Sequence, residues 1–110
     1  MKFYRGLYVG ESIRKVNKVK WKLSIGAGQF GVYVIALACN RDQLDIFHCA
    51  MLRQKHFDRR SLRVVGLAGS MDEAFGLVER MARDAWEDGM EGDIRGYLQK
   101  RMGPAKGGSG

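Results

Sequence analysis

The chain has 110 residues, of which 45% are hydrophobic and 28% are charged, and its net charge is +7. This balance excludes a disordered chain and is typical of one globular domain with its own core. A transmembrane helix is excluded because the longest apolar segment, Val32 to Cys39, is much shorter than the ~20 residues that a bilayer requires. The N-terminus lacks the apolar core of a signal peptide, so we expect a cytoplasmic protein whose two cysteines are free thiols.

The positive charge is concentrated in the first half of the chain. Residues 1 to 63 carry 13 Lys or Arg and four Asp or Glu, a net charge of +9. Residues 64 to 110 carry six Lys or Arg and eight Asp or Glu, a net charge of −2. Such a field favours anionic partners, which include nucleic acid, acidic protein surfaces and anionic lipid. The first half is therefore where binding residues are expected.

Two elements are predicted before the first glycine-rich connection. Residues 2 to 9 combine aromatic and β-branched side chains and predict a strand. Residues 11 to 24 fit either a helix, because apolar residues recur every three or four positions, or a half-buried strand, because residues 18 to 25 alternate lysine and serine with apolar residues. We favour the helix, since a crossover is expected between two strands. In both interpretations we expect Trp21 in the core.

The middle of the chain begins with its most apolar strand, Val32 to Ala38, which lacks alternation and is therefore expected to be covered on both faces. The segment from Gln43 to Phe57 has two interpretations. It forms one helix opened by a weak capping box of Asn40 and Gln43, or it forms a strand at Leu44 to His48 followed by a short helix at Ala50 to Phe57. We prefer the second interpretation because the residues of that strand are not strong helix formers.

The clearest structural signal lies between Arg63 and Trp86. The apolar run from Arg63 to Ala68 predicts a short strand covered on both faces. Ser70 and Glu73 then have the spacing of a capping box that opens an amphipathic helix. Gly76 lies inside that helix, and a close contact with a strand or a neighbouring helix is the expected reason for it.

The C-terminal part is predicted to contain one further helix. Asp93 can cap it, and Gly103 and Pro104 stop it. Residues 103 to 110 have linker composition and are interpreted as a flexible tail or an added remnant. The predicted fold is one compact domain of the α/β or α+β class over residues 1 to 102, with three or four strands covered by helices and a short C-terminal helix. A fourth strand at residues 44 to 48 would make it a split β-α-β arrangement, and its absence would leave three β-α units.

Several stretches between Leu7 and Leu98 carry a family resemblance: LYVGESI, VKWKL, GQFGVYVIALA, DQLDIFHCAMLRQKHF and VVGLAGSMDEAFGLV. This succession resembles small uncharacterised proteins of intestinal bacteria, some of which are carried by mobile genetic elements. The resemblance implies a bacterial cytoplasmic accessory role and assigns no functional residues.

The turn at Gly69 and Ser70 is one candidate site for an anionic ligand, because backbone donors at the start of a helix can bind phosphate. It lacks the spacing of a dinucleotide fingerprint and of a P-loop. Asp72 and Glu73 also place negative charge where the anion would lie. We therefore favour a structural turn over an anion site.

Four thiol and imidazole side chains were considered as zinc ligands, namely those of Cys39, His48, Cys49 and His56. They contain no C-x2-C pair, and adjacent residues of a strand point in opposite directions. No orienting group or oxyanion motif accompanies the cysteines as a nucleophile would need. We therefore expect no metal, no cofactor and no catalytic site.

The strongest candidate is a basic surface. Its first cluster has five cations around Trp21, and on a helix three of them would share one face at successive steps of four residues. A second cluster follows in the loop region before residue 63, and the fold could bring the two together. The predicted nucleic-acid-binding residues are Arg14, Lys15, Lys18, Lys20, Lys22, Arg53, Lys55, Arg59 and Arg60.

These observations lead to a non-enzymatic binding protein that contacts nucleic acid or a nucleoprotein assembly through its basic half. The alternative is a protein-interaction module or homodimer, without nucleic-acid binding, that uses exposed parts of Phe75, Trp86, Tyr97 or the last helix. A small anionic-ligand site at Gly69 and Ser70 is the weaker alternative. The named partners are therefore nucleic acid, an acidic protein surface or a second copy of the chain, and no membrane.

Overall fold

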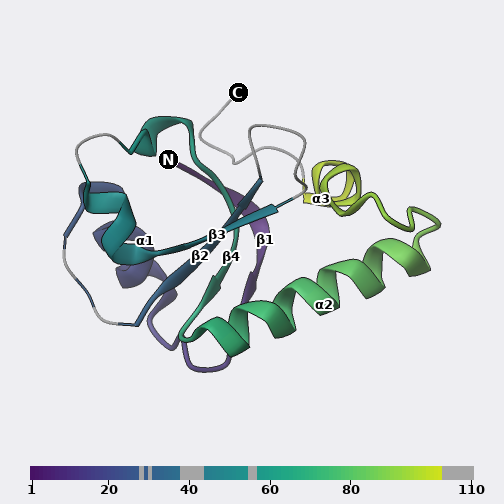
Figure 1. The fold of residues 1–110 in the computed structure, drawn as a ribbon, viewed down its shortest axis with the longest axis horizontal. Coiled ribbons are helices and arrows are strands. Elements are labelled where there is room, and N and C mark those ends of the chain that lie inside the picture. Colours follow the sequence, from purple (N-terminus) through teal and green to yellow (C-terminus); the bar gives the residue numbers. More distant parts are fainter. Residues whose placement is uncertain (28, 30, 38–43, 55–56, 103–110) are drawn as a thin grey trace.

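The structure is a computed structural model that describes residues 1–27, 29, 31–37, 44–54 and 57–102. In these residues it contains four strands, three α-helices and two short 3₁₀ helices (Figure 1). In chain order they are β1 (Lys2–Val9), α1 (Val16–Ile25), β2 (Tyr33–Leu37), β3 (Leu44–His48), η1 (Cys49–Arg53), η2 (Arg59–Ser61), β4 (Arg63–Ala68), α2 (Met71–Glu87) and α3 (Ile94–Met102).

The four strands form one mixed sheet in the order β1-β4-β2-β3. β1 and β4 are parallel neighbours, whereas β2 is antiparallel to both β4 and β3. The α+β domain expected from the sequence is therefore confirmed, including the fourth strand at Leu44–His48. Ala38, the last residue of the predicted central strand, and the capping box proposed at residues 40 and 43 lie outside the described residues.

The sheet is covered on both faces (Figure 1). α1 and the two 3₁₀ helices lie on one side, and α2 and α3 lie on the other. On β4, Val64 packs in the cluster that contains Leu23 of α1, while the next residue, Val65, packs in the cluster that contains Met81 of α2. This double cover explains why the apolar strands lack alternation.

Residues 16 to 25 form a helix, as we favoured, which ends where Gly26 adopts a left-handed conformation at φ 73°. Its buried residue is Leu23, and no side chain caps its start at Lys15. The expectation that Trp21 is in the core is wrong, because its side chain is 60% exposed. Since successive residues of a helix are about 100° apart, Trp21 lies roughly 200° from Leu23 and faces solvent.

The segment after β3 is shorter than predicted. In place of a helix over residues 50 to 57, the structure has η1, which ends at Arg53. The His48 imidazole accepts a hydrogen bond from the Ala50 amide at 3.1 Å and caps this turn. Cys49 is a buried free thiol whose Sγ donates to the backbone oxygen of Gln29 at 3.3 Å. These contacts explain His48 and Cys49 as structural residues.

α2 starts at the predicted cap, where Ser70 Oγ accepts a hydrogen bond from the Glu73 amide at 3.0 Å. The reciprocal half of the capping box differs from the prediction, since the Glu73 carboxylate accepts from the Gly69 amide at 2.6 Å and from Ser12. Gly76 also differs, because a Cβ placed on it would meet no atom within 4 Å outside its own local backbone. The expected close contact at Gly76 is therefore wrong.

The two edge strands of the sheet differ in the regularity of their pairing. At the β1 edge, the register moves from Phe3 opposite Val64 to Tyr8 opposite Gly66, so β1 bulges between them. Gly6 lies in this bulge at φ 70°, a conformation that favours glycine. β3, at the other edge, pairs with β2 without a register shift.

Within the described residues, no helix has the length and apolar character needed to cross a membrane.

The C-terminal helix α3 begins as predicted, since Asp93 Oδ1 accepts a hydrogen bond from the Gly96 amide at 3.0 Å. Its side chains Tyr97 and Leu98 are buried in the cluster shared with α2 and β1. α3 is therefore part of the domain core and is not a free appendage.

Candidate anion-binding site

The candidate site lies where two parallel strands end. β1 and β4 are neighbours, and the chain leaves β1 toward α1 on one face of the sheet but leaves β4 toward α2 on the other (Figure 1). In open sheets, such a divergence of connections leaves a crevice at the carboxyl ends of the strands, where ligands commonly bind. A cavity of about 390 Å³ is found there, lined by residues after β1, from α1, before β2 and after β4.

Three cations line this cavity, namely Arg14, Lys18 and Lys22. The two lysines are one helical turn apart, about 6 Å along the axis of α1. Arg14 precedes the first residue of α1, so the loop, and not a third helical turn, brings it to the cavity. None of the lining residues that the structure describes is acidic. The three cations predicted to share one helix face therefore line one cavity, but Arg14 reaches it from the loop before α1.

None of these three cations is paired with a carboxylate in the part of the chain that the structure describes. The ion pairs given by the described residues join Lys100 to Asp88 and Arg101 to Asp84, on the opposite face of the sheet. A cation without an internal partner keeps its charge available for an anion, because nothing in the fold neutralises it. The site therefore has net positive charge in a concave place, where the field is focused.

The remaining walls combine apolar side chains with one polar group. Ile13, Val19 and Val32 supply the apolar part. Gln29 also lines the cavity. Among the described residues, its Nε2 is the one buried side-chain nitrogen or oxygen atom that has no hydrogen-bond partner. Because buried polar groups normally have partners, an unsatisfied donor beside a cavity indicates a place for a water molecule or a ligand oxygen.

The rim of the cavity is held by Glu73. Its carboxylate accepts hydrogen bonds from the Ser12 hydroxyl at 2.6 Å, the Ser12 amide at 3.2 Å and the Gly69 amide at 2.6 Å. These bonds lower the pKa of Glu73 below its ordinary value, and the bond from the Ser12 hydroxyl has the largest effect. A Cβ on Gly10 would collide with this carboxylate, and one on Gly69 would collide with Ser12. The two glycines therefore permit Glu73 to link the loops after β1 and β4.

This arrangement bears on the predicted site at Gly69 and Ser70. The Gly69 amide is bonded to Glu73, and the Ser70 hydroxyl caps α2. The Gly69 amide is thus engaged as a donor within the protein, the Ser70 hydroxyl oxygen is the acceptor of the cap, and Gly69 contributes to the cavity as part of its wall. An anion would meet the side chains of α1 before it met this turn.

The other predicted cations that the structure describes do not line the cavity. Lys15 is exposed before α1, and the Lys20 ammonium lies 5.6 Å from the centre of the Phe3 ring, beside a separate hollow along β1. Arg53 and Arg60 are exposed on η1 and η2, on the same side of the sheet as α1, but neither lines the cavity. For the two remaining residues, Lys55 lies outside the described residues, and Arg59 is placed by its backbone alone, in η2.

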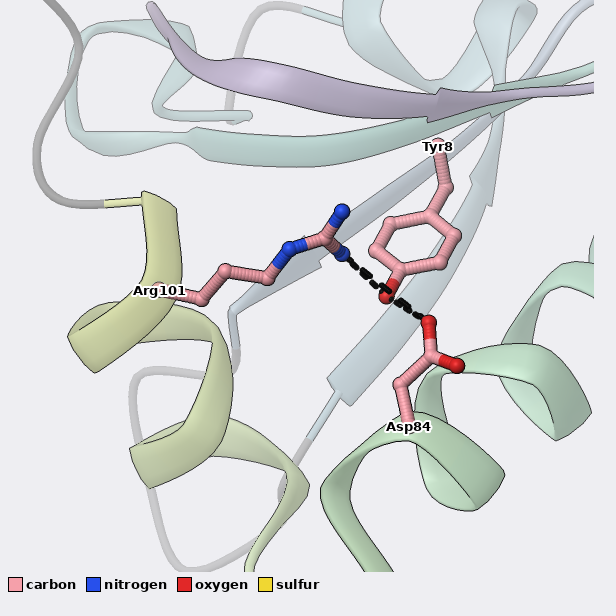
Figure 2. A network of polar contacts seen from close by, with 3 residues as sticks. All are labelled: Tyr8, Asp84 and Arg101. Atoms are coloured by element: carbon pink, nitrogen blue, oxygen red, sulfur yellow. Dashed lines mark hydrogen bonds and ion pairs between the residues drawn. The ribbon is translucent and has the colours of Figure 1, made fainter. Parts of the chain in front are cut away.

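A second polar cluster, not predicted from the sequence, lies on the opposite face of the sheet. Figure 2 shows the Tyr8 hydroxyl between Asp84 of α2 and Arg101 of α3. Tyr8 donates to Asp84 Oδ2 at 2.5 Å and accepts from Arg101 Nη1 at 2.5 Å, while Arg101 Nη1 is 3.9 Å from Asp84 Oδ2. Burial and the bond to Asp84 raise the pKa of Tyr8 well above its ordinary value, so it remains a neutral donor.

This second cluster borders a hollow of about 270 Å³ that also contacts Arg80, whose guanidinium lies 5.6 Å from the Tyr8 ring centre. Its members come from β1, α2 and α3, and they satisfy one another. No spacing in the sequence could have indicated it, because Tyr8 and Arg101 are 93 residues apart.

Two of the zinc and thiol candidates, His48 and Cys49, belong to the described residues. No group of three or more His, Cys, Asp or Glu side chains suited to a metal ion is present in the part of the chain that the structure describes. Cys39 and His56 lie outside that part.

Comparison of the chain with models of known families, with curated proteins and with solved structures finds no match. The resemblance to small proteins of intestinal bacteria therefore stays a prediction.

Proposed function

We propose that this protein binds nucleic acid, directly or within a nucleoprotein assembly, through the cavity lined by Arg14 of the loop before α1 and by Lys18 and Lys22 of α1. The observation that supports this proposal is the convergence of these three cations, unpaired by any described carboxylate, on one cavity at the carboxyl ends of β1 and β4. Lys and Arg side chains contact phosphate groups and release the counterions that surround them, which drives association without regard to base sequence.

Other exposed cations lie outside the cavity. Arg53 and Arg60 are exposed on the same side of the sheet as α1, and Lys15 is exposed at its start. Arg60 precedes β4 and lies beside Met1, at the amino ends of β1 and β4, so it is at the other end of these strands from the cavity. The cavity cations are therefore the central contacts, and the other cations add nonspecific attraction.

The test is equilibrium binding to duplex and single-stranded oligonucleotides over a series of salt concentrations. We expect the logarithm of the affinity to fall linearly with the logarithm of the salt concentration. The variant Lys18→Gln/Lys22→Gln should reduce the slope for duplex DNA by about 2, since each phosphate contact contributes about 0.9. Absent binding at low salt, or binding that does not respond to salt, would remove the proposal.

The matched control is Lys15→Gln/Lys20→Gln, which removes the same charge from the same region without touching the cavity lining. Its slope should change by less than that of the cavity variant. Equal losses in the two double variants would mean that overall charge, and not the cavity, governs binding. Circular dichroism of both variants checks that α1 is intact.

A second candidate function, a protein contact or homodimer, is favoured by the outer side of α2. Phe75 and Trp86 are 54% and 61% exposed, and Met71 near the start of the helix is also exposed. Tyr97, which we also proposed for such a contact, is buried and is not available. Sedimentation equilibrium should then give a mass that rises with concentration, and Phe75→Ser/Trp86→Ser should return it to the monomer value. A monomer mass at every concentration would exclude the homodimer.

A further inference from the structure

We infer that the cavity at the carboxyl ends of β1 and β4 holds a phosphate monoester, such as the terminal phosphate of a nucleic-acid strand, with Lys18, Lys22, Arg14 and the Gln29 amide as its binding groups. This inference rests on the proposed nucleic-acid binding and names the part of the nucleic acid that the cavity takes.

The shape of the site favours a terminal group over the middle of a strand. The cations line an open hollow formed by four segments of the chain, in which a single phosphate group can face more than one of them. A terminal phosphate is attached through one ester bond and can enter a hollow end-on. A phosphodiester is attached on both sides and has to pass across it.

The charge of the site also favours a monoester. A phosphate monoester carries about −1.5 to −2 charges near pH 7, because its second pKa is about 6. A phosphodiester carries one. Three cations without a described carboxylate partner line one cavity and match the larger charge, and Glu73 at the rim, which keeps its own negative charge, is engaged by hydrogen bonds from Ser12 and Gly69.

The cavity walls accommodate the rest of such a ligand. A volume of about 390 Å³ exceeds what a phosphate group alone requires and falls within the range of small-ligand pockets. Ile13, Val19 and Val32 offer apolar surface for the attached sugar and base. The Gln29 Nε2, buried and without a partner, supplies a donor that a phosphate oxygen would satisfy.

The first experiment compares one single-stranded oligonucleotide with and without a 5′-phosphate, and the same pair with a 3′-phosphate, at fixed salt. We expect one of the phosphorylated forms to bind about tenfold more tightly, the effect of one or two charge-assisted hydrogen bonds. Lys22→Gln and Gln29→Leu should abolish this preference, whereas Lys20→Gln should retain it because Lys20 lies outside the cavity. A preference that all three variants retain would place the phosphate elsewhere and overturn the inference.

The second experiment tests whether the cavity binds the phosphate group itself when it is not attached to a strand. Nucleoside monophosphate, the matching nucleoside and inorganic phosphate are added separately to ¹⁵N-labelled protein, and the amide signals of Gly31, Val32 and Gly69 are followed. We expect the monophosphate to shift these signals and the nucleoside to leave them unchanged. Shifts of equal size with the nucleoside would overturn the role of the phosphate.

The two proposals fail in distinguishable ways. If all oligonucleotides bind with the same salt-dependent affinity and no monophosphate shifts the cavity signals, the monoester site is wrong and nucleic-acid binding stands. If no oligonucleotide binds but the monophosphate shifts the signals, nucleic-acid binding is wrong and the cavity is a site for a small phosphorylated ligand.

Discussion

The two polar hollows of this domain contain similar cations in opposite situations. On the α2 and α3 side, Arg101 is bonded to the Tyr8 hydroxyl and lies near Asp84, so its charge is satisfied by the fold. On the α1 side, Lys18 and Lys22 line a cavity without a described acidic neighbour in its wall. The difference teaches that cations with internal partners hold elements together, whereas cations without them leave the protein able to bind an anion.

This comparison predicts separate effects on stability and on binding. Substitutions around Tyr8 should lower the free energy of unfolding and leave nucleic-acid affinity unchanged. Substitutions of the cavity lysines should lower nucleic-acid affinity and leave the free energy of unfolding unchanged, because their side chains form no ion pair with a described carboxylate. A cavity variant with a free energy of unfolding well below that of the wild type would contradict this prediction.

The largest effect on stability is expected for Asp84→Ala. It removes the acceptor of the Tyr8 hydroxyl and the carboxylate nearest Arg101, so the free energy of unfolding should fall by about 2 kcal/mol, the range for hydrogen bonds to charged groups. Urea denaturation measures it. The control is Asp88→Ala, whose pair with Lys100 is solvent-exposed and should contribute less than about 1 kcal/mol. Equal losses would remove the special role of the Tyr8 cluster.

A somewhat smaller effect is expected for Glu73→Ala, which separates the loops after β1 and β4. The lost bonds to Ser12 and Gly69 should lower the free energy of unfolding by about 1.5 kcal/mol, the lower end of the charge-assisted range because the carboxylate is partly solvated. Removing a negative charge from the cavity rim should also raise the affinity for phosphorylated oligonucleotides a few-fold. Asp72→Ala, which removes an exposed acid from the same helical turn, is the control and should change affinity less.

Gly76→Ala is expected to act in the opposite direction. The position is helical, and an added Cβ would meet no neighbouring atom within 4 Å, so the substitution should raise the free energy of unfolding by about 0.5 to 1 kcal/mol. Since α2 carries both Glu73 and Asp84, this variant stabilises the helix between the two hollows without altering either of them. Thermal denaturation would contradict the prediction if the variant melted below the wild type.

The smallest effect should appear only at alkaline pH. The pKa of Tyr8 is raised in the folded protein by burial and by its bond to Asp84, while in the unfolded chain it is about 10. The neutral hydroxyl therefore stabilises the fold fully below pH 10, and this contribution declines as the pH rises above that value. The difference in unfolding free energy between wild type and Tyr8→Phe should shrink between pH 9 and pH 11. A constant difference would mean that Tyr8 is not held by these contacts.

The fold was largely predictable from local patterns. The strand at residues 63 to 68 and the cap at Ser70 follow from the change of an apolar run into a helical period, and both are found where predicted. Trp21 was misplaced because alternation with lysine resembles a half-buried strand, whereas the helix turns this side chain to solvent. Gly76 was misinterpreted because spacing along a helix does not reveal what faces it.

The candidate site was predictable only in part. The basic residues in and just before α1 are visible in the sequence, and three of them line one cavity. Their cavity depends on β4 pairing beside β1, which joins segments about 60 residues apart and which no local pattern specifies. The role of Glu73 at the rim depends on the same pairing, since Ser12 reaches it only because the two strands are neighbours.

The bulge in β1 has a consequence for how this protein behaves among its own copies. A strand from another molecule can add to a sheet border only where amides and carbonyls stand in an even row. β1 breaks that row between Phe3 and Tyr8, and the exposed side chains of Lys2 and Arg5 add repulsion between like-charged borders. This border is thereby closed to templated growth of the sheet. The chain can thus have an unpaired edge strand without promoting polymerisation at that edge.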